Sequence, residues 1–170
     1  MIADLICNLL DTEYSYYKKL GAEKKPSLPE PFTASRYEDA QRFQNYSCSP
    51  VMEGFEPDTH AAEQWSDPFK GGWIAHKQGS CIKFNVSGSI IMLQYRKTIN
   101  KPAPVAYAVI DGDRQNKVLL DANFDEDWGD LCCLEEIYSG AKGEHTVEIV
   151  IDTEGKENSD FMLISVITAN

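Results

Sequence analysis

The sequence predicts a mainly β fold: an antiparallel β-sandwich of the jelly-roll kind, with one α-helix at its N-terminus. Two observations carry this prediction. Short apolar runs of period two follow one another along most of the chain, with Gly and Asp between them, which is the pattern of an antiparallel sandwich. Helical spacing of apolar residues is confined to the first 20 positions.

The composition describes one globular unit of acidic character. The chain has 170 residues, of which 42% are hydrophobic and 25% charged, close to the usual size and composition of a single domain. Its net charge is −11, from 16 basic and 27 acidic residues. Such a chain repels phosphate backbones and anionic lipid, so we expect no nucleic-acid or membrane partner. Neutral ligands such as sugars, and cationic ligands, remain open.

The first element is a helix over residues 1–20. Its apolar side chains recur at the spacing of a single helix face, which must cover another surface. These residues are Ile2, Leu5, Ile6, Leu9 and Leu10, with Asp4, Asn8 and Asp11 on the opposite side. Gly21 is a natural helix stop.

A proline-rich connector follows the helix. Pro26, Pro29 and Pro31 fix the backbone and lack amide donors, so residues 21–32 are expected to be an extended linker. The β-sandwich domain is then expected over 33–170.

The sandwich strands are read from alternating apolar residues. A turn is expected at Ser87-Gly88 and a hairpin at Asp111-Gly112, a dipeptide that tolerates positive φ. The final run is apolar on both sides and should be a central strand. The expected runs are 82–86, 91–95, 105–109, 118–120, 147–151 and 161–167.

Three tryptophans are the main binding signal. Trp65 and Trp73 lie in a segment without clean periodicity, 54–78, and Trp128 lies in a second expected loop. An indole face on a loop can stack on a sugar ring, and Asp67 and Asp127 can accept hydrogen bonds from its hydroxyls. These five residues form the predicted ligand site. The alternative is that each tryptophan plugs one end of the sandwich.

Signals of catalysis or metal binding are weaker. There is no GxSxG elbow. A group of five carboxylates offers a pair for glycoside hydrolysis or ligands for calcium, although a solvated acidic loop is the favoured interpretation. These carboxylates are Asp121, Asp125, Glu126, Asp127 and Asp130. His60 beside Glu56 or Glu63 would resemble a general base, with a surface histidine as the favoured alternative. We therefore predict no catalytic residue, no metal ligand and no cofactor, with calcium left open.

The cysteines indicate a reducing compartment. Their number is odd, and the neighbours Cys132 and Cys133 are poorly placed to bridge one another. The N-terminal residues also lack the pattern of a secretory signal. We expect reduced thiols and a cytoplasmic protein.

Two parts of the chain resemble known carbohydrate esterases. The run Met1–Leu10 is similar to the last helix of SGNH/GDSL-type hydrolases, and the β region resembles their jelly-roll accessory domains, grouped with family-35-like carbohydrate-binding modules. The segments that carry the resemblance of the β region are Phe69-Lys70-Gly71-Gly72-Trp73, Ile82–Gly88, Val109–Asp113 and Gly143–Ile149.

The resemblance implies a non-catalytic role. The family's serine block, oxyanion-hole blocks and Asp-x-x-His block have no counterpart in this sequence, so no catalytic residue is carried over. It implies a module that binds or helps to enclose an acetylated plant polysaccharide or its oligosaccharides, with an SGNH hydrolase domain as partner. Two alternatives remain: a structural domain that packs on the hydrolase without binding glycan, and, ranked last, a glycan-cleaving enzyme that uses the carboxylates of 121–130.

Overall fold

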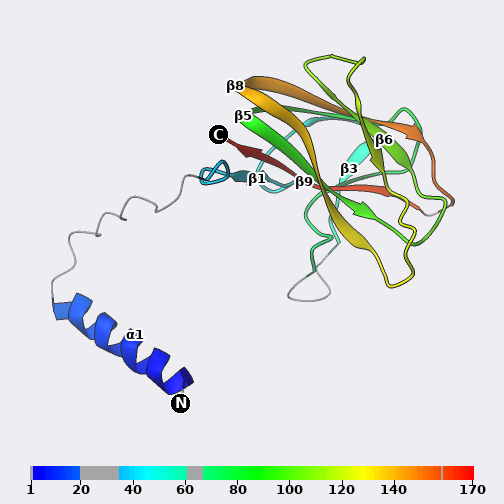
Figure 1. Cartoon of the computed structure of the whole chain (residues 1–170). Coiled ribbons are helices and arrows are strands. Elements are labelled where there is room, and N and C mark those ends of the chain that lie inside the picture. Colours follow the sequence, from blue (N-terminus) through cyan, green and yellow to red (C-terminus); the bar gives the residue numbers. More distant parts are fainter. Residues whose placement is uncertain (1, 20–34, 61–66, 158) are drawn as a thin grey trace. The chain divides into compact units, whose positions relative to one another are not determined.

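The chain divides into two units, Met1–Ala34 and Ser35–Asn170, and each is described by itself. The computed structural model describes residues 2–19, 35–60, 67–157 and 159–170 (Figure 1). The expected linker at 21–32 lies outside these residues.

The first unit contains the predicted helix. Helix α1 spans Ile2–Lys19, and Leu5, Ile6, Leu9 and Leu10 on its apolar face are all exposed. An isolated helix of this length is marginal in water, because most helical stability comes from tertiary packing. Across the described residues, no helix combines the length and apolarity needed to span a bilayer.

The second unit is the predicted antiparallel β-sandwich. Every pairing between its named strands is antiparallel. The strands of the described residues are β1 (Gln41–Phe43), β2 (Val51–Glu53), β3 (Phe55–Pro57), β4 (Trp73–Ala75), β5 (Cys81–Lys97), β6 (Val105–Ile110), β7 (Val118–Asp121), β8 (Leu131–Thr153) and β9 (Phe161–Ala169).

Two long strands, β5 and β8, connect the layers of the sandwich. They pair along almost their full length, from Cys81 opposite Val150 to Lys97 opposite Leu131. The first half of β5 also pairs with β2 and its second half with β9, while the second half of β8 pairs with β6. Each strand therefore contributes to both layers, as Figure 1 shows for the green and golden ribbons.

The turn expected at Ser87-Gly88 does not occur, and β5 runs through it. The register with β8 shifts between Gly88 and Ile90, the mark of a β-bulge, which bends a strand without ending it. A Cβ at Gly88 would lie only 3.0 Å from the carbonyl oxygen of Ala169. Glycine therefore serves close packing at the bend here, which a sequence pattern cannot distinguish from a turn. The hairpin residues Asp111 and Gly112 do have positive φ, as expected.

Strand β9 is central, as predicted. It pairs with β5 on one side and with β4 and then β1 on the other. Phe161 and Leu163 contribute to the main core between the layers, whereas Met162 and Ile164 pack in a second cluster. The apolar residues on both faces of this strand are explained by these two contacts.

The main core is made by alternating side chains of β5, β8 and their neighbours. Ile82, Phe84 and Ile149 point inward and are almost fully buried, and each such side chain stabilises the fold by about 1.5–3 kcal/mol. The five cysteines form no disulfide. Burial and the negative charge of Glu148 raise the pKa of the Cys81 thiol to about 11, which makes it a poor nucleophile near neutral pH.

Gly72 is expected to tolerate no side chain. A Cβ there would overlap the carbonyl oxygen of Leu163 and lie 2.8 Å from Cα of Ile164, both in β9. Because backbone atoms cannot give way cheaply, Gly72→Ala should lower the free energy of unfolding by roughly 3 kcal/mol. Urea unfolding followed by circular dichroism measures this change. The control is Gly143→Ala, where the nearest atom is a histidine side chain 3.4 Å away; equal losses in both variants would contradict the prediction.

Candidate functional site

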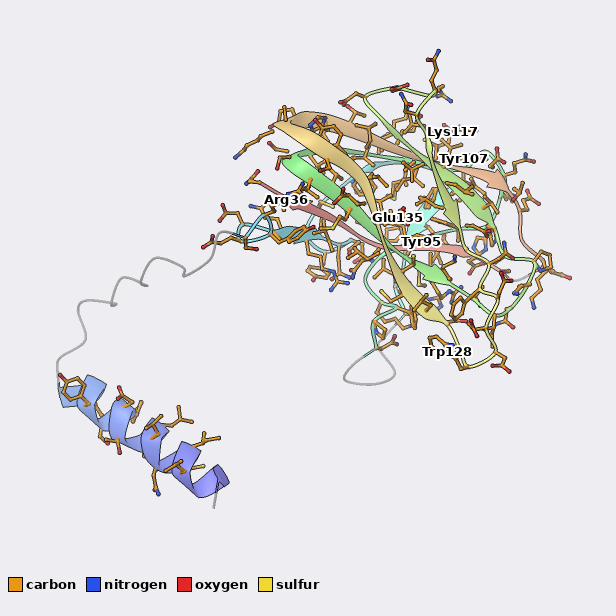
Figure 2. All side chains as sticks on the ribbon, viewed as in Figure 1. Arg36, Tyr95, Tyr107, Lys117, Trp128 and Glu135 are labelled. Carbon is orange, nitrogen blue, oxygen red and sulfur yellow. The ribbon has the colours of Figure 1, made fainter. Side chains whose placement is uncertain are left out.

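The loop between β7 and β8 presents an exposed indole. Trp128 is 64% exposed and lies at one end of the sandwich (Figure 2). The ring of Phe124 packs against it nearly at a right angle, with centroids 5.1 Å apart. An edge-to-face pair of this kind fixes the orientation of an aromatic ring. The indole is thus supported by a neighbouring ring and still open to solvent.

The base of this loop is held by backbone and amide hydrogen bonds. Thr98 N donates to Ala122 O at 2.8 Å, and Phe124 N donates to Thr98 O at 3.0 Å. Asn123 Nδ2 donates to Asp121 Oδ1 at 2.6 Å. A loop that is ordered in advance lowers the entropic cost of binding a ligand.

Several carboxylates lie close to Trp128 in the sequence, and two of them are available to bind a ligand. Glu126 and Asp127 are exposed and have no polar partner among the described residues. Asp125 instead accepts a hydrogen bond from Lys101 Nζ at 2.5 Å, and this bond lowers the pKa of its carboxyl. Glu126 and Asp127 are therefore the groups beside Trp128 that can accept hydrogen bonds from a hydroxyl-rich ligand.

The other carboxylates of this region serve structural contacts. Asp121 accepts from Asn123, as above, and Asp130 accepts from Ile99 N at 3.4 Å and lies 3.7 Å from Arg96 Nε. No group of three or more His, Cys, Asp or Glu side chains in the described parts of the chain is placed to hold a metal ion. The described residues therefore bring together no carboxylate cluster here that would hold calcium.

Trp73 is not a ligand contact, and this prediction is wrong. It lies in β4, is only 1% exposed, and packs against Phe84 with ring centroids 5.0 Å apart. The segment 54–78 was expected to be a loop, but Phe55 pairs with Ala75 across β3 and β4. Strands of three residues are too short to show a period of two, so the sequence pattern could not reveal them.

The other residues of the predicted ligand site differ in where the structure places them. Trp65 lies outside the described residues. Asp67 Oδ1 accepts a hydrogen bond from Phe69 N at 3.0 Å, and its other oxygen lies 4.0 Å from Lys70 Nζ. The carboxylate of Asp67 therefore contacts residues of its own turn, and no contact among the described residues joins it to Trp128. Of the predicted set, Trp128 and Asp127 are the accessible members among the residues that the structure describes.

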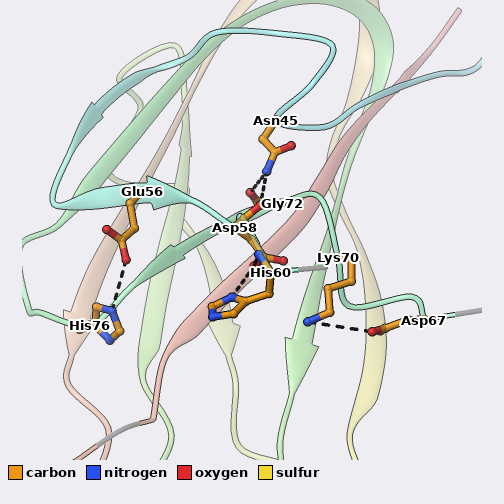
Figure 3. A network of polar contacts seen from close by, with 8 residues as sticks. All are labelled: Asn45, Glu56, Asp58, His60, Asp67, Lys70, Gly72 and His76. Carbon is orange, nitrogen blue, oxygen red and sulfur yellow. Dashed lines mark hydrogen bonds and ion pairs between the residues drawn. The ribbon is translucent and has the colours of Figure 1, made fainter. Parts of the chain in front are cut away.

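A buried aspartate holds His60, whose side chain is exposed, as the favoured interpretation expected, and the alternative pairing with Glu56 does not occur. Asp58 Oδ1 accepts from His60 N at 3.0 Å and lies 2.8 Å from His60 Nδ1 (Figure 3). Glu56 instead lies 3.9 Å from His76 Nε2, and Glu63 is outside the described residues. Sequence reasoning missed Asp58, although a carboxylate two residues before a backbone amide is the spacing of an Asx turn.

The Asp58 carboxylate is buried and charged. Burial favours its neutral form, but the hydrogen bonds from His60 and the positive charge of Lys70 outweigh burial and hold its pKa below the ordinary value. Its backbone is fixed as well, because Asn45 Nδ2 donates to both Asp58 O and Gly72 O at 2.8 and 2.9 Å. These two hydrogen bonds join the segment that follows β3 to Gly72, the residue before β4.

Asp58→Asn should therefore weaken the fold in a pH-dependent way. A lowered carboxyl pKa contributes stability that is present above the unfolded value, near 3.9, and is lost as the pH falls through the folded value. We expect a loss of about 1 kcal/mol at pH 7 that shrinks below pH 4. Urea unfolding at pH 7, 5, 4 and 3.5 measures the difference. A constant difference across this range would contradict the assignment.

The chain resembles some solved structures, although other comparisons found no match. No protein-family model and no curated protein matches the chain. Among solved structures, it is similar to a two-domain esterase (CEX) active on acetylated mannans and co-crystallized with mannopentaose, with 39% identity and a TM-score of 0.78, over 96% of this chain and 45% of that one. A second structure of such an esterase gives 37% identity, the same TM-score, and coverage of 96% and 46%.

A more distant structure shows the fold alone. It is a family two carbohydrate esterase from Cellvibrio japonicus, at 14% identity and a TM-score of 0.52, over 77% of this chain and 33% of that one. The chain spans less than half the length of the esterases that it matches. With more than a third of its residues identical to part of the mannan esterase, the chain is related to two-domain carbohydrate esterases, as its sequence predicted.

Proposed function

We propose that the chain is a non-catalytic carbohydrate-binding accessory domain of an SGNH-type carbohydrate esterase, and that it holds an oligosaccharide or polysaccharide against Trp128. The observation that carries the proposal is the exposed indole on a loop braced at its base. The related esterase, active on acetylated mannans, suggests mannan-derived chains as the ligand.

The chemistry of the loop suits a neutral, hydroxylated ligand. An indole face offers a large rigid surface for the C–H face of a sugar ring. Glu126 and Asp127 supply hydrogen-bond acceptors without a competing partner among the described residues. A net charge of −11 disfavours anionic ligands at this loop but does not affect neutral mannan.

Trp128→Ala should weaken the binding of mannopentaose by about tenfold or more, because stacking on an exposed ring supplies most of the contact area. Isothermal titration of the chain with mannopentaose measures the affinity. The control is Tyr46→Ala, which removes another exposed ring (79%) from a different loop. Unchanged affinity in Trp128→Ala, or an equal loss in both variants, would contradict the proposal.

A second role, contact with the hydrolase domain, is supported by helix α1. Its leucines and isoleucine are exposed along one face, and the matching esterases contain more than half of their length beyond the part that this chain covers. An apolar stripe of this kind is stable only against another surface. The structural role considered as an alternative above and glycan binding are compatible, since they use different units of the chain.

Charges on this face should abolish that contact. We expect the chain to co-elute in gel filtration with the separately produced remainder of the related mannan esterase, and Leu5→Glu/Leu9→Glu to elute alone because buried charges are costly. The control, Asn8→Glu/Ser15→Glu, adds the same charge on the polar face and should still co-elute. Equal behaviour of the two double variants would show that this face makes no such contact.

A further inference from the structure

A second groove lies on the outer face of the β6–β8 layer. Ala106 and Ala108 of β6 point into the core, so Tyr107 and Val109 between and after them face outward. Tyr107 lies opposite Val150 of β8. The groove has a volume of about 180 Å³ and is lined by Tyr107, Val109, Arg114, Lys117, Val150 and Asp152. Figure 2 shows Tyr107 apart from Trp128, which lies at one end of the sandwich.

Lys117 is a cation without a carboxylate partner in this groove. Its Nζ lies 3.5 Å from the centroid of the Tyr107 ring, a cation–π contact that holds the ammonium over the groove. The neighbouring cations are already paired: Lys83 Nζ and Arg114 Nη2 contact the two oxygens of Glu148 at 2.9 and 3.2 Å. Among the described residues, Lys117 has no ion pair, in a chain with a net charge of −11.

The groove also has two chemically different ends. Arg114 and Lys117 belong to the 111–117 connection, which follows the Val109 end of β6. Asp152 lies on β8 toward the other end of β6, where Thr153 pairs with Val105. Between these ends the floor is apolar, formed by Val109 and Val150. A ligand that fits carries negative charge at one end and hydroxyl donors at the other.

The volume limits the ligand to one ring. It is well below the roughly 300 Å³ at which pockets begin to enclose drug-sized molecules. A single pyranose ring presents an apolar C–H face to a valine floor, while a longer chain would extend into solvent.

We propose that this groove binds one sugar-acid residue, with its carboxylate at Lys117 and its hydroxyls at Asp152. Tyr107 is the positioning residue that holds the Lys117 ammonium. The site is separate from the Trp128 loop, and the proposal does not rest on the proposed function there.

The test is a titration of the intact chain with glucuronate, glucose and benzoate, followed by amide chemical shifts in NMR spectra. We expect glucuronate to shift amides of β6 and the 111–117 connection, and to bind more tightly than either comparison ligand. Lys117→Met should weaken glucuronate binding by about tenfold, the range of one charge-assisted hydrogen bond. Lys142→Met removes the same charge elsewhere and serves as control.

Each other outcome overturns the proposal. Equal binding of glucose would mean that the carboxylate is not recognised, and equal binding of benzoate would mean that the hydroxyls are not. An equal effect of Lys117→Met and Lys142→Met would mean that glucuronate is attracted by the overall charge of the chain and not by Lys117. The absence of shifts at 20 mM glucuronate, roughly the weakest useful affinity, would exclude the site. Trp128→Ala should leave glucuronate binding unchanged, so this result is independent of the mannopentaose titration.

Discussion

The pairing of β5 with β8 is the constraint on which the rest of the second unit depends. These strands run through both layers, so the positions of their inward side chains set the core and the positions of their ends set the loops. A slip of one residue would turn every inward side chain outward. The bulge after Gly88 lets one continuous strand serve both layers, and the apolar faces of β9 close the core against it.

The strands of this sandwich set the position of the Trp128 loop. It leaves β7 and enters β8, and its base is tied to the residues that follow β5 through Thr98. An exposed indole would be an aggregation hazard on a mobile segment, but on a braced loop it is a preformed contact surface. In the connection between β6 and β7, Lys117 lies above Tyr107 on the outer face of the β6–β8 layer. Loops at the ends and edges of one rigid sandwich can in this way carry distinct ligand chemistries.

Much of the fold could be predicted from the sequence, because alternation and helical spacing report directly on burial. The helix, the central final strand and the Asp111-Gly112 hairpin all followed from local pattern. The strand through Gly88 and the burial of Trp73 did not, since a glycine in a bulge resembles a turn and a three-residue strand has no visible period. The site was harder still: exposure separates Trp128 from Trp73, and exposure depends on tertiary packing. The partner of His60 was missed for a different reason: Asp58 lies two residues earlier, at the spacing of an Asx turn, and this local signal was not used.

The central claim is that this scaffold turns one indole outward to meet a glycan while another stays inside the core. The most direct measurement is a titration of the protein with mannopentaose, observed through the indole N–H resonances in NMR spectra. The account predicts that the Trp128 resonance moves progressively to saturation while that of Trp73, buried in β4, stays in place. A Trp128 resonance that does not respond while the protein binds the sugar, or no binding at all, would contradict it.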